Sequence, residues 1–180
     1  MSKKIDVLSL KGEKVKDIKL EDNIFNIEPN DAVVKDAIVA AMAGARQGSI
    51  RATQYRHGGI AFGPVPRDYS KKMNKKEKRL ALKSALSYKV LDKELVVVDA
   101  IKFDTNKTKE MTNLLEVLGL TNHKVLVCVK ELTDNVCLAA RNLANVKVVM
   151  PNEVNTYDLV SSDNLLIEEE ALTALEEVLK

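Results

Sequence analysis

The 180-residue chain has 46% hydrophobic and 30% charged side chains and a net charge of +2, a composition that excludes collagen-like and disordered proteins and predicts one globular domain over residues 1–180. The longest stretch of small apolar residues, 37–45, is about half of the ~20 residues needed to span a bilayer, so we expect no membrane partner. The first residues lack the apolar core of a secretory signal, and we therefore expect a cytoplasmic protein.

A hairpin and then a helix are predicted in the first quarter of the chain. Apolar residues alternate along 5–10 and 15–20, and the Lys-Gly-Glu run at 11–13 between them is typical of a tight turn. The Pro-Asn-Asp run at 29–31 favours a helix start, and apolar residues recur at helical spacing until Gly44.

The next stretch has the composition of a long loop. Residues 44–66 contain five of the seven glycines and two of the four prolines, without apolar periodicity. A loop of this length is uncommon in a compact domain unless it is functional. Tyr55, Phe62 and Tyr69 are interleaved with arginines, which combines flat faces for exposed bases with cations for phosphates. We predict an extended basic Gly/Arg-rich loop over 44–73 within the domain.

A basic helix is predicted to follow this loop. Asn74 and Glu77 have the spacing of a capping box, and the apolar pattern continues to about Val90. Lysines crowd the first turns, although the helix dipole is positive there by about half a charge. We expect an anion such as a phosphate to offset this penalty, because it would bind both the free N–H groups and the lysines.

The second half of the chain alternates short apolar strands with helices, which is typical of βαβ units and of a parallel sheet buried on both faces. The predicted fold class is therefore α/β, with an open, mainly parallel sheet flanked by helices in a Rossmann-like three-layer arrangement, to which the N-terminal hairpin and the basic loop are added. The predicted strands are 95–98, 125–129, 146–150 and 165–167, and the predicted helices are 108–118, 134–143 and 169–179.

Positive charge is concentrated in the middle of the chain. The net charge is −1 over residues 1–45, +10 over 46–93 and −7 over 94–180, and no carboxylate occurs between Asp36 and Asp68. Solvated surfaces usually mix both signs, because like charges repel and destabilise a compact state. The segregation therefore favours a polyanion-binding surface over a merely solvated one.

The sequence does not support a catalytic or metal site. No glycine-rich phosphate-binding motif is present, and Asp99 and Asp134 near strand ends are explained as helix caps or solvated carboxylates. Cys128 and Cys137 are predicted to be reduced, buried thiols. A zinc site is not expected, because it would want about four ligands at short spacings, whereas His57 and His123 lie far apart and the two cysteines are nine residues from each other. We expect no enzyme activity, no cofactor, no metal and no small-molecule substrate.

Two other functions stay open on these grounds. Open parallel sheets commonly bind ligands at the carboxyl ends of their strands, so one alternative is an α/β nucleotide-binding enzyme, which a mononucleotide would stabilise. The other is a protein-interaction module that uses the acidic C-terminal surface and keeps its partners after the basic segment is deleted.

Several runs share a pattern with one known family. The most specific is Gly-Gly-Ile-Ala-Phe-Gly-Pro-Val-Pro-Arg at 58–67, and the others lie at 46–51, 75–84, 107–109 and 140–143. Together they resemble the bacterial L-four family of large-subunit ribosomal proteins over essentially the whole chain. The chain departs from the family at Gly48, where a long excursion is missing, and at 52–57, where a run with Pro and Trp is replaced.

The resemblance implies a structural constituent of the large ribosomal subunit that binds 23S rRNA, supports subunit assembly and lies beside other large-subunit proteins. It also implies that the basic loop is directed toward the peptide exit tunnel. The loop and the basic face of the following helix are expected to contact rRNA. The expected contact residues are Arg46, Gln47, Arg51, Tyr55, Arg56, His57, Arg67, Lys71, Lys72, Lys75, Lys76, Arg79 and Lys83.

Overall fold

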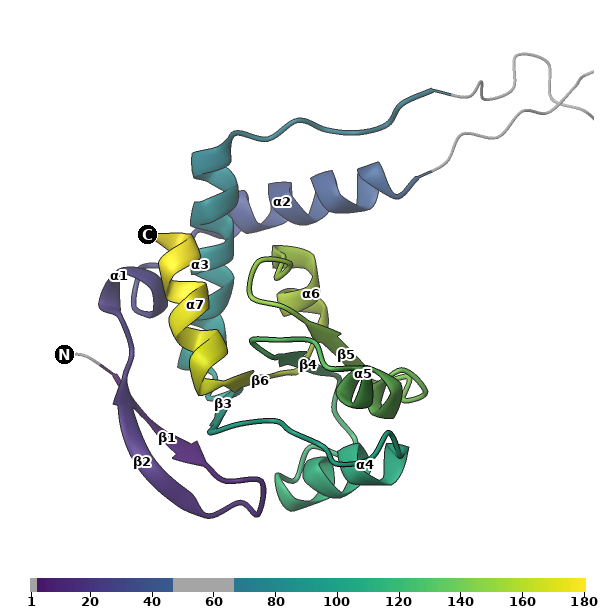
Figure 1. Ribbon diagram of the computed structural model, residues 1–180. Helices are drawn as coiled ribbons and strands as arrows, with labels where there is room; N and C mark the ends of the chain where they lie inside the picture. The colour runs from purple at the N-terminus through teal and green to yellow at the C-terminus, as the bar shows by residue number, and fades with distance from the viewer. Residues whose placement is uncertain (1–2, 47–66) are drawn as a thin grey trace, which may run out of the picture.

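The computed structural model describes residues 3–46 and 67–180, which form a mixed six-stranded sheet with helices on both faces (Figure 1). The strand order is β2-β1-β3-β6-β4-β5. β1 and β2 are antiparallel, and every other pair of neighbouring strands is parallel. The predicted α/β class is confirmed. The strands are β1 Lys4–Leu8, β2 Lys14–Lys19, β3 Leu95–Val98, β4 Val125–Cys128, β5 Val146–Val149 and β6 Asn164–Glu168.

The predicted N-terminal hairpin is formed by β1 and β2. Its turn is closed by a 2.8 Å hydrogen bond from the Ser9 N–H to the Glu13 carbonyl, and Gly12 has a φ of +79°. A left-handed φ of this kind favours glycine. A Cβ at Gly12 would also lie 3.0 Å from Val117 Cγ1, which is a tight contact, so the positive φ is the main reason for glycine in this turn.

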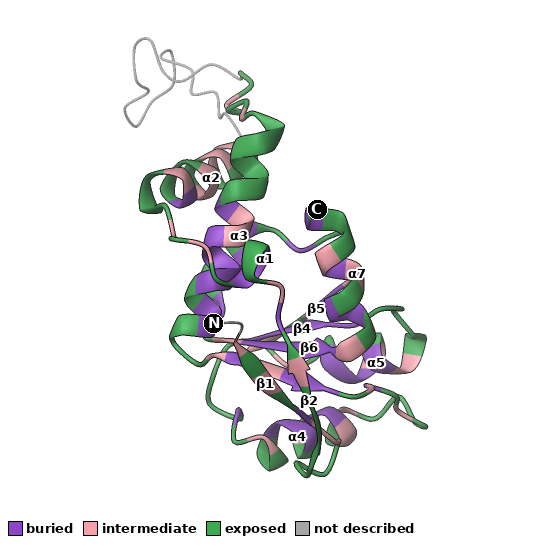
Figure 2. Ribbon diagram, turned by 90° about the vertical axis from the view of Figure 1, so that its left-hand side faces the viewer, coloured by how far each residue is buried: buried purple, intermediate pink, exposed green. Residues whose placement is uncertain are grey.

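Helices cover the sheet in two layers. α1 Asp22–Phe25, α3 Lys75–Leu91, α6 Thr156–Ser161 and α7 Glu169–Leu179 share one hydrophobic cluster with the sheet, and α4 Thr108–Val117 and α5 Asp134–Ala140 share the other. The central strands β4 and β6 lie between these layers and are buried, whereas β2 at the edge of the sheet is largely exposed (Figure 2). The three-layer arrangement agrees with the sequence analysis, but the short helices α1 and α6 were not predicted.

Alternation along the central strands explains why they are apolar throughout. Leu165 and Ile167 of β6 belong to the cluster under α3 and α7, whereas Leu166 between them belongs to the cluster under α4 and α5. Successive side chains of a strand point to opposite faces, so a strand covered on both faces must be hydrophobic at every position.

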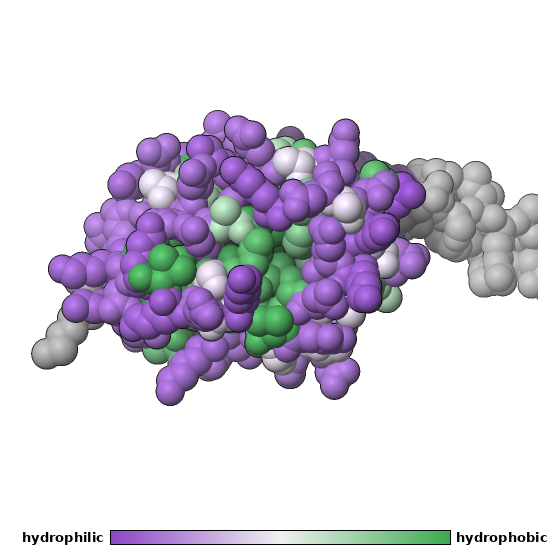
Figure 3. Space-filling model, turned by 60° about the horizontal axis from the view of Figure 1, so that its bottom comes forward, coloured by the Kyte–Doolittle hydropathy of each residue, from purple (hydrophilic) through white to green (hydrophobic). Residues whose placement is uncertain are grey.

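The outer surface of the molecule on the side of the hairpin and α4 is mainly hydrophilic and surrounds a smaller hydrophobic area (Figure 3).

α2 Asp31–Gly44 differs from the other long helices because it extends away from the sheet (Figure 1). Its start is capped by Asn30, whose side chain accepts a 3.2 Å hydrogen bond from the Val33 N–H. Val34 is its single buried residue. The helix thus places the start of the basic segment at the edge of the body.

One prediction about the cysteines is wrong. Cys128 lies in the buried strand β4, but Cys137 is exposed on α5. The inward face of α5 is formed by Val136, Ala139 and Ala140, and Cys137 is one position away from that face. The helix also ends at Ala140, three residues earlier than predicted.

Candidate nucleic-acid interface

Helices α2 and α3 precede and follow the predicted basic loop, residues 44–73, which we call the basic segment. α2 leads to Arg46, and the chain returns at Arg67 and runs along 67–74 into α3. The two helices are joined where the Asn30 N–H donates a 3.2 Å hydrogen bond to Ser84 Oγ. Both ends of the segment are therefore held by one connected pair of helices.

Tyr69 brings the two ends together. The guanidinium carbon of Arg46 lies 4.7 Å from the centre of the Tyr69 ring, and that of Arg67 lies 4.6 Å from it. Each exposed cation–π contact of this kind contributes roughly 0.5–1 kcal/mol. The two guanidinium groups are consequently no farther apart than about one Debye length (~10 Å at 0.1 M salt), so an anion near both would relieve their repulsion.

Asp68 does not neutralise these arginines. Its carboxylate accepts a 2.8 Å hydrogen bond from the Ser70 N–H and a 2.7 Å hydrogen bond from Ser70 Oγ. These bonds, the backbone one first, hold the pKa of Asp68 below its ordinary value. The carboxylate is bound within its own turn, and within the described part of the chain no ion pair joins it to an arginine.

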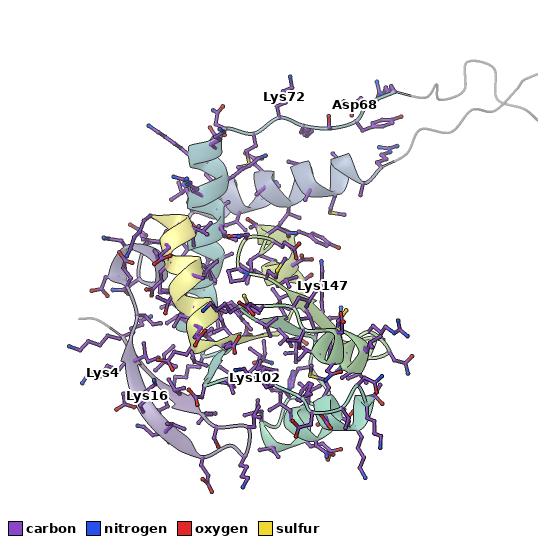
Figure 4. All side chains as sticks on the ribbon, in the orientation of Figure 1. Lys4, Lys16, Asp68, Lys72, Lys102 and Lys147 are labelled. Carbon is purple, nitrogen blue, oxygen red and sulfur yellow. The ribbon has the colours of Figure 1, made fainter. Side chains whose placement is uncertain are left out.

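The predicted cations of this region form a surface that we call the basic ridge. Its members are exposed, apart from the half-buried Lys83, and Lys72 points away from the body (Figure 4). Among residues 3–46 and 67–180, none of them forms an ion pair. The ridge consists of Arg46, Arg67, Lys71, Lys72, Lys75, Lys76, Arg79 and Lys83.

The start of α3 is arranged as predicted. Asn74 and Glu77 form the capping box, with the Asn74 N–H donating a 3.2 Å hydrogen bond to Glu77 Oε2. Glu77 is the one acidic residue of the first turn, where Lys75 and Lys76 also lie. The positive end of the helix dipole and the lysines therefore act together on whatever anion approaches.

Lys89 is the exception among the cations of α3, because it is only 7% exposed. Its Nζ donates hydrogen bonds of 2.7 Å to the Ser162 carbonyl and 2.9 Å to the Asp163 carbonyl, and it pairs with Glu94. This lysine links α3 to the loop before β6. Sequence analysis did not single it out, although its spacing from Ala85 and Leu86 places it on the apolar face of the helix.

Five of the predicted contact residues lie outside the described residues. They are Gln47, Arg51, Tyr55, Arg56 and His57. The predicted loop over 44–73 is described only at its two ends, 44–46 and 67–73.

The carboxyl edge of the sheet, where α/β enzymes bind ligands, is bridged by Glu168. Its carboxylate accepts a 3.4 Å hydrogen bond from the Ile101 N–H and a 2.9 Å hydrogen bond from the Lys130 N–H. These residues follow β3 and β4, so Glu168 ties together the loops after three adjacent strands. Sequence analysis missed this role because one glutamate at a strand end carries no distinguishing pattern.

Nothing else at this edge forms a reactive site within the described residues. Burial, and secondarily the charge of Glu168, raises the pKa of Cys128 to about 12, so its thiol stays protonated. Asp99 and Asp134 are exposed. No group of three or more His, Cys, Asp or Glu among these residues is arranged to hold a metal ion, and none of the described helices is long and apolar enough to cross a membrane.

Six lysines outside the ridge are paired with carboxylates in the described part of the chain, namely Lys14, Lys16, Lys89, Lys130, Lys147 and Lys180. Lys16 contacts Glu169 at 2.7 Å, Lys130 contacts Glu170 at 2.7 Å, and Lys147 contacts Asp158 at 2.6 Å. These pairs connect the hairpin, the sheet edge and the acidic C-terminal part of the chain. Some lysines of the body are thus neutralised by ion pairs, whereas no cation of the ridge is neutralised in this way within the described residues.

Comparison with known proteins identifies a family. The sequence model of the ribosomal protein L4/L1 family matches residues 42–178. A protein named large ribosomal subunit protein uL4 from Brevibacillus brevis is 41% identical to this chain over 205 residues, which cover 98% of this chain and 99% of that protein. Proteins with the same name from Thermoanaerobacter sp. strain X514 and Thermoanaerobacter pseudethanolicus are each 40% identical over 204 residues, covering 97% of this chain and 98% of theirs.

Proposed function

Because this chain belongs to the ribosomal protein L4/L1 family, we propose that it is a cytoplasmic constituent of the large ribosomal subunit that binds 23S rRNA through the basic ridge. It is a structural protein and not an enzyme, as the family is. In this proposal residues 1–180 act as one domain, and the segment 44–73 extends from it into rRNA toward the peptide exit tunnel. Binding of this kind supports assembly of the subunit.

One observation carries the proposal: the cations of the ridge gather along 67–83 and at Arg46, and none of them has a carboxylate partner among the described residues. Unneutralised cations on one surface cost stability through mutual repulsion. A polyanion removes that cost and releases its condensed counterions on binding. The charge arrangement is therefore suited to a nucleic-acid backbone.

The ridge has features suited to RNA in particular. The planar guanidinium groups of Arg46 and Arg67, held by the Tyr69 ring, offer flat faces as well as charge, and unpaired bases stack on such groups. Lys75 and Lys76 lie at a helix start, where a phosphate would also meet free backbone N–H groups. Contacts of Gln47, Arg51, Tyr55, Arg56 and His57 with rRNA are also part of this proposal.

The salt dependence of rRNA binding tests the proposal. In a triple variant, Lys75, Lys76 and Arg79 are each replaced by Gln, and affinity for 23S rRNA is measured by filter binding between about 50 and 200 mM salt. Each lost phosphate contact lowers the slope of log affinity against log salt by ~0.7–0.9, so we expect a decrease of about two to three units.

A matched triple variant provides the control. Lys11, Lys102 and Lys124 are exposed lysines outside the ridge, and their replacement by Gln changes the net charge equally. We expect its slope to stay within half a unit of the unmodified protein, on the order of what non-local charge contributes. Equal slopes for the two triple variants would refute the ridge as the phosphate-binding surface.

Two further measurements address the subunit and the tunnel. The protein should co-sediment with large subunits after a high-salt wash, and a photoreactive residue at position 51 should crosslink to rRNA of the tunnel wall. The carboxylates of α7 are proposed to face neighbouring large-subunit proteins. Loss from the salt-washed subunit would count against the structural role, whereas crosslinks elsewhere in rRNA would remove only the tunnel assignment.

A further inference from the structure

A cavity of about 440 Å³ lies where α2, α3, α6 and the end of α7 meet, next to the basic ridge. We propose that it binds a single unpaired nucleotide of rRNA, with the base inside and its phosphate at the rim. This inference rests on the proposed function and adds a defined pocket to it. The volume falls within the ~300–1,000 Å³ that is usual for small-ligand sites.

The inner wall of the cavity is apolar and provides a surface for a base. Ala37, Ala40 and Ala41 of α2 form one side, and Leu82 of α3 and Val154 before α6 contribute to the rest. Small alanine side chains leave room between the helices that larger residues would fill. A flat ring can occupy such a slot with little loss of packing.

Tyr157 supplies an aromatic face at the mouth of the cavity. It lines the cavity from α6 and is 42% exposed, so part of its side chain is accessible. Aromatic side chains of this kind are the usual stacking partners of unpaired RNA bases. Asn152 also lines the cavity and is exposed, and its amide can both donate and accept hydrogen bonds at the edge of a base.

The charge of the lining selects an anionic ligand. Lys71, Lys78 and Arg79 line the cavity, and no aspartate or glutamate does. Within the part of the chain that the structure describes, none of these three cations forms an ion pair. A phosphate next to an apolar slot matches this combination, whereas an apolar peptide would leave three cations unpaired.

The position of the cavity favours RNA over a free nucleotide. Lys71 and Arg79 belong both to the basic ridge and to the lining, so an RNA strand on the ridge passes the mouth of the cavity. A second groove, of about 730 Å³, lies near the other end of α3 and mixes Lys3, Lys4 and Lys93 with Asp6. That groove has neither the uniform charge nor the connection to the ridge.

Photocrosslinking gives the direct test. The intact protein is bound to 23S rRNA transcribed from Brevibacillus brevis with 4-thiouridine in place of part of the uridine, irradiated, and digested for mass spectrometry of the crosslinked peptides. We expect crosslinks to Tyr157 or to its neighbours in 152–157, in addition to crosslinks in the ridge. Crosslinks confined to the ridge would overturn the pocket while leaving rRNA binding in place, and a failure to bind rRNA at all would overturn the proposed function itself.

Substitutions at Tyr157 separate stacking from folding. Tyr157→Ala should weaken rRNA binding about tenfold without changing the salt slope, because it removes a stacking face and no charge. Tyr157→Phe keeps the ring and should bind within about twofold of the unmodified protein. Thermal melting of both variants shows that the fold is intact. Equal affinities of the Ala and Phe variants, or an equal loss in both, would overturn the pocket.

A substitution at Lys78 tests whether a phosphate binds at the rim of the cavity. Sequence analysis did not include Lys78 among the rRNA contacts, so this test is independent of that prediction. Lys78→Gln should lower the salt slope by ~0.7–0.9, and Lys11→Gln in the hairpin turn, which makes the same charge change far from the cavity, should leave it unchanged. An unchanged slope for Lys78→Gln would exclude a phosphate at the rim. In reconstituted subunits, a crosslink from Tyr157 to another ribosomal protein instead of rRNA would overturn the nucleotide as the occupant.

Discussion

Several lysines of the body have partners that the cations of the basic ridge lack among the described residues. In the body, Lys16, Lys130 and Lys147 each contact a carboxylate, and Lys89 is buried among carbonyl groups. On the ridge, the cations contact a tyrosine ring or no carboxylate at all within the described residues. The contrast shows that the local partners of a lysine, more than its residue type, distinguish a lysine that stabilises the fold from a lysine that is available to bind a ligand.

The largest expected effect comes from Lys89, which sits on a ridge helix but belongs to the body. Lys89→Met leaves the buried carbonyl of Ser162 and the partly buried carbonyl of Asp163 without their lysine donor, and we expect a loss of about 2–4 kcal/mol in the free energy of unfolding. Urea denaturation measures it. Lys83→Met on the same helix should change the free energy of unfolding by no more than about 0.5 kcal/mol. Similar losses for both variants would mean that ridge lysines stabilise the fold as much as Lys89 does.

A smaller effect is expected at Glu168, which ties the loops at the sheet edge. Glu168→Ala removes the acceptor of the Ile101 and Lys130 N–H groups and should cost about 1–3 kcal/mol. The affinity of the Glu168→Ala variant for rRNA should be unchanged, because Glu168 lies outside the ridge. Glu170→Ala, which breaks only an exposed pair with Lys130, should leave the free energy of unfolding almost unchanged. A drop in rRNA affinity for Glu168→Ala would extend the interface to the sheet edge.

Reversing charge at the start of α3 should stabilise the free protein. Lys75→Glu combined with Lys76→Glu replaces cations by anions near the positive end of the helix dipole, and each such favourable charge contributes roughly 0.3–1 kcal/mol. Thermal melting should therefore show a higher Tm, while rRNA binding falls more than tenfold. A lower Tm would mean that the ridge lysines also stabilise the fold.

The smallest effect concerns the two thiols. At pH 8 a thiol reagent should modify the exposed Cys137 in the native protein and should reach Cys128 only after unfolding, because burial raises the pKa of Cys128 to about 12. Above pH 9 the unfolded thiol ionises while the folded one does not, so this group lowers stability as pH rises toward 12. Cys137→Ser serves as the control and should give no native reactivity. Rapid modification of Cys128 in that variant would show that water reaches the sheet.

Local signals explain which elements could be predicted from the sequence. Asn74 and Glu77 gave the start of α3, and β3 was predicted with its observed bounds because Leu95–Val98 is a short apolar run between polar segments. α1 and α6 were missed because four and six residues are too few for a helical period to be evident. Cys137 was misplaced because an apolar residue near a helix face can still point outward.

Contacts between distant segments explain what the sequence could not show. The insertion of β6 between β3 and β4 depends on tertiary packing and has no local signature. The role of Glu168 and the cavity beside Tyr157 follow from that packing, since their partners come from several elements. The ridge could be predicted in large part because its cations are close together in sequence, and charge density is visible without a fold.

The stacking of Tyr69 on Arg46 has a consequence for how the family varies in length. Because Arg46 and Tyr69 are in contact, the two ends of the chain between them lie close together. Insertions or deletions there need not displace α2 or α3, because the entropy of closing a longer loop grows only slowly with its length. Natural selection can thus lengthen or shorten the segment between these residues while α2 and α3 stay the same.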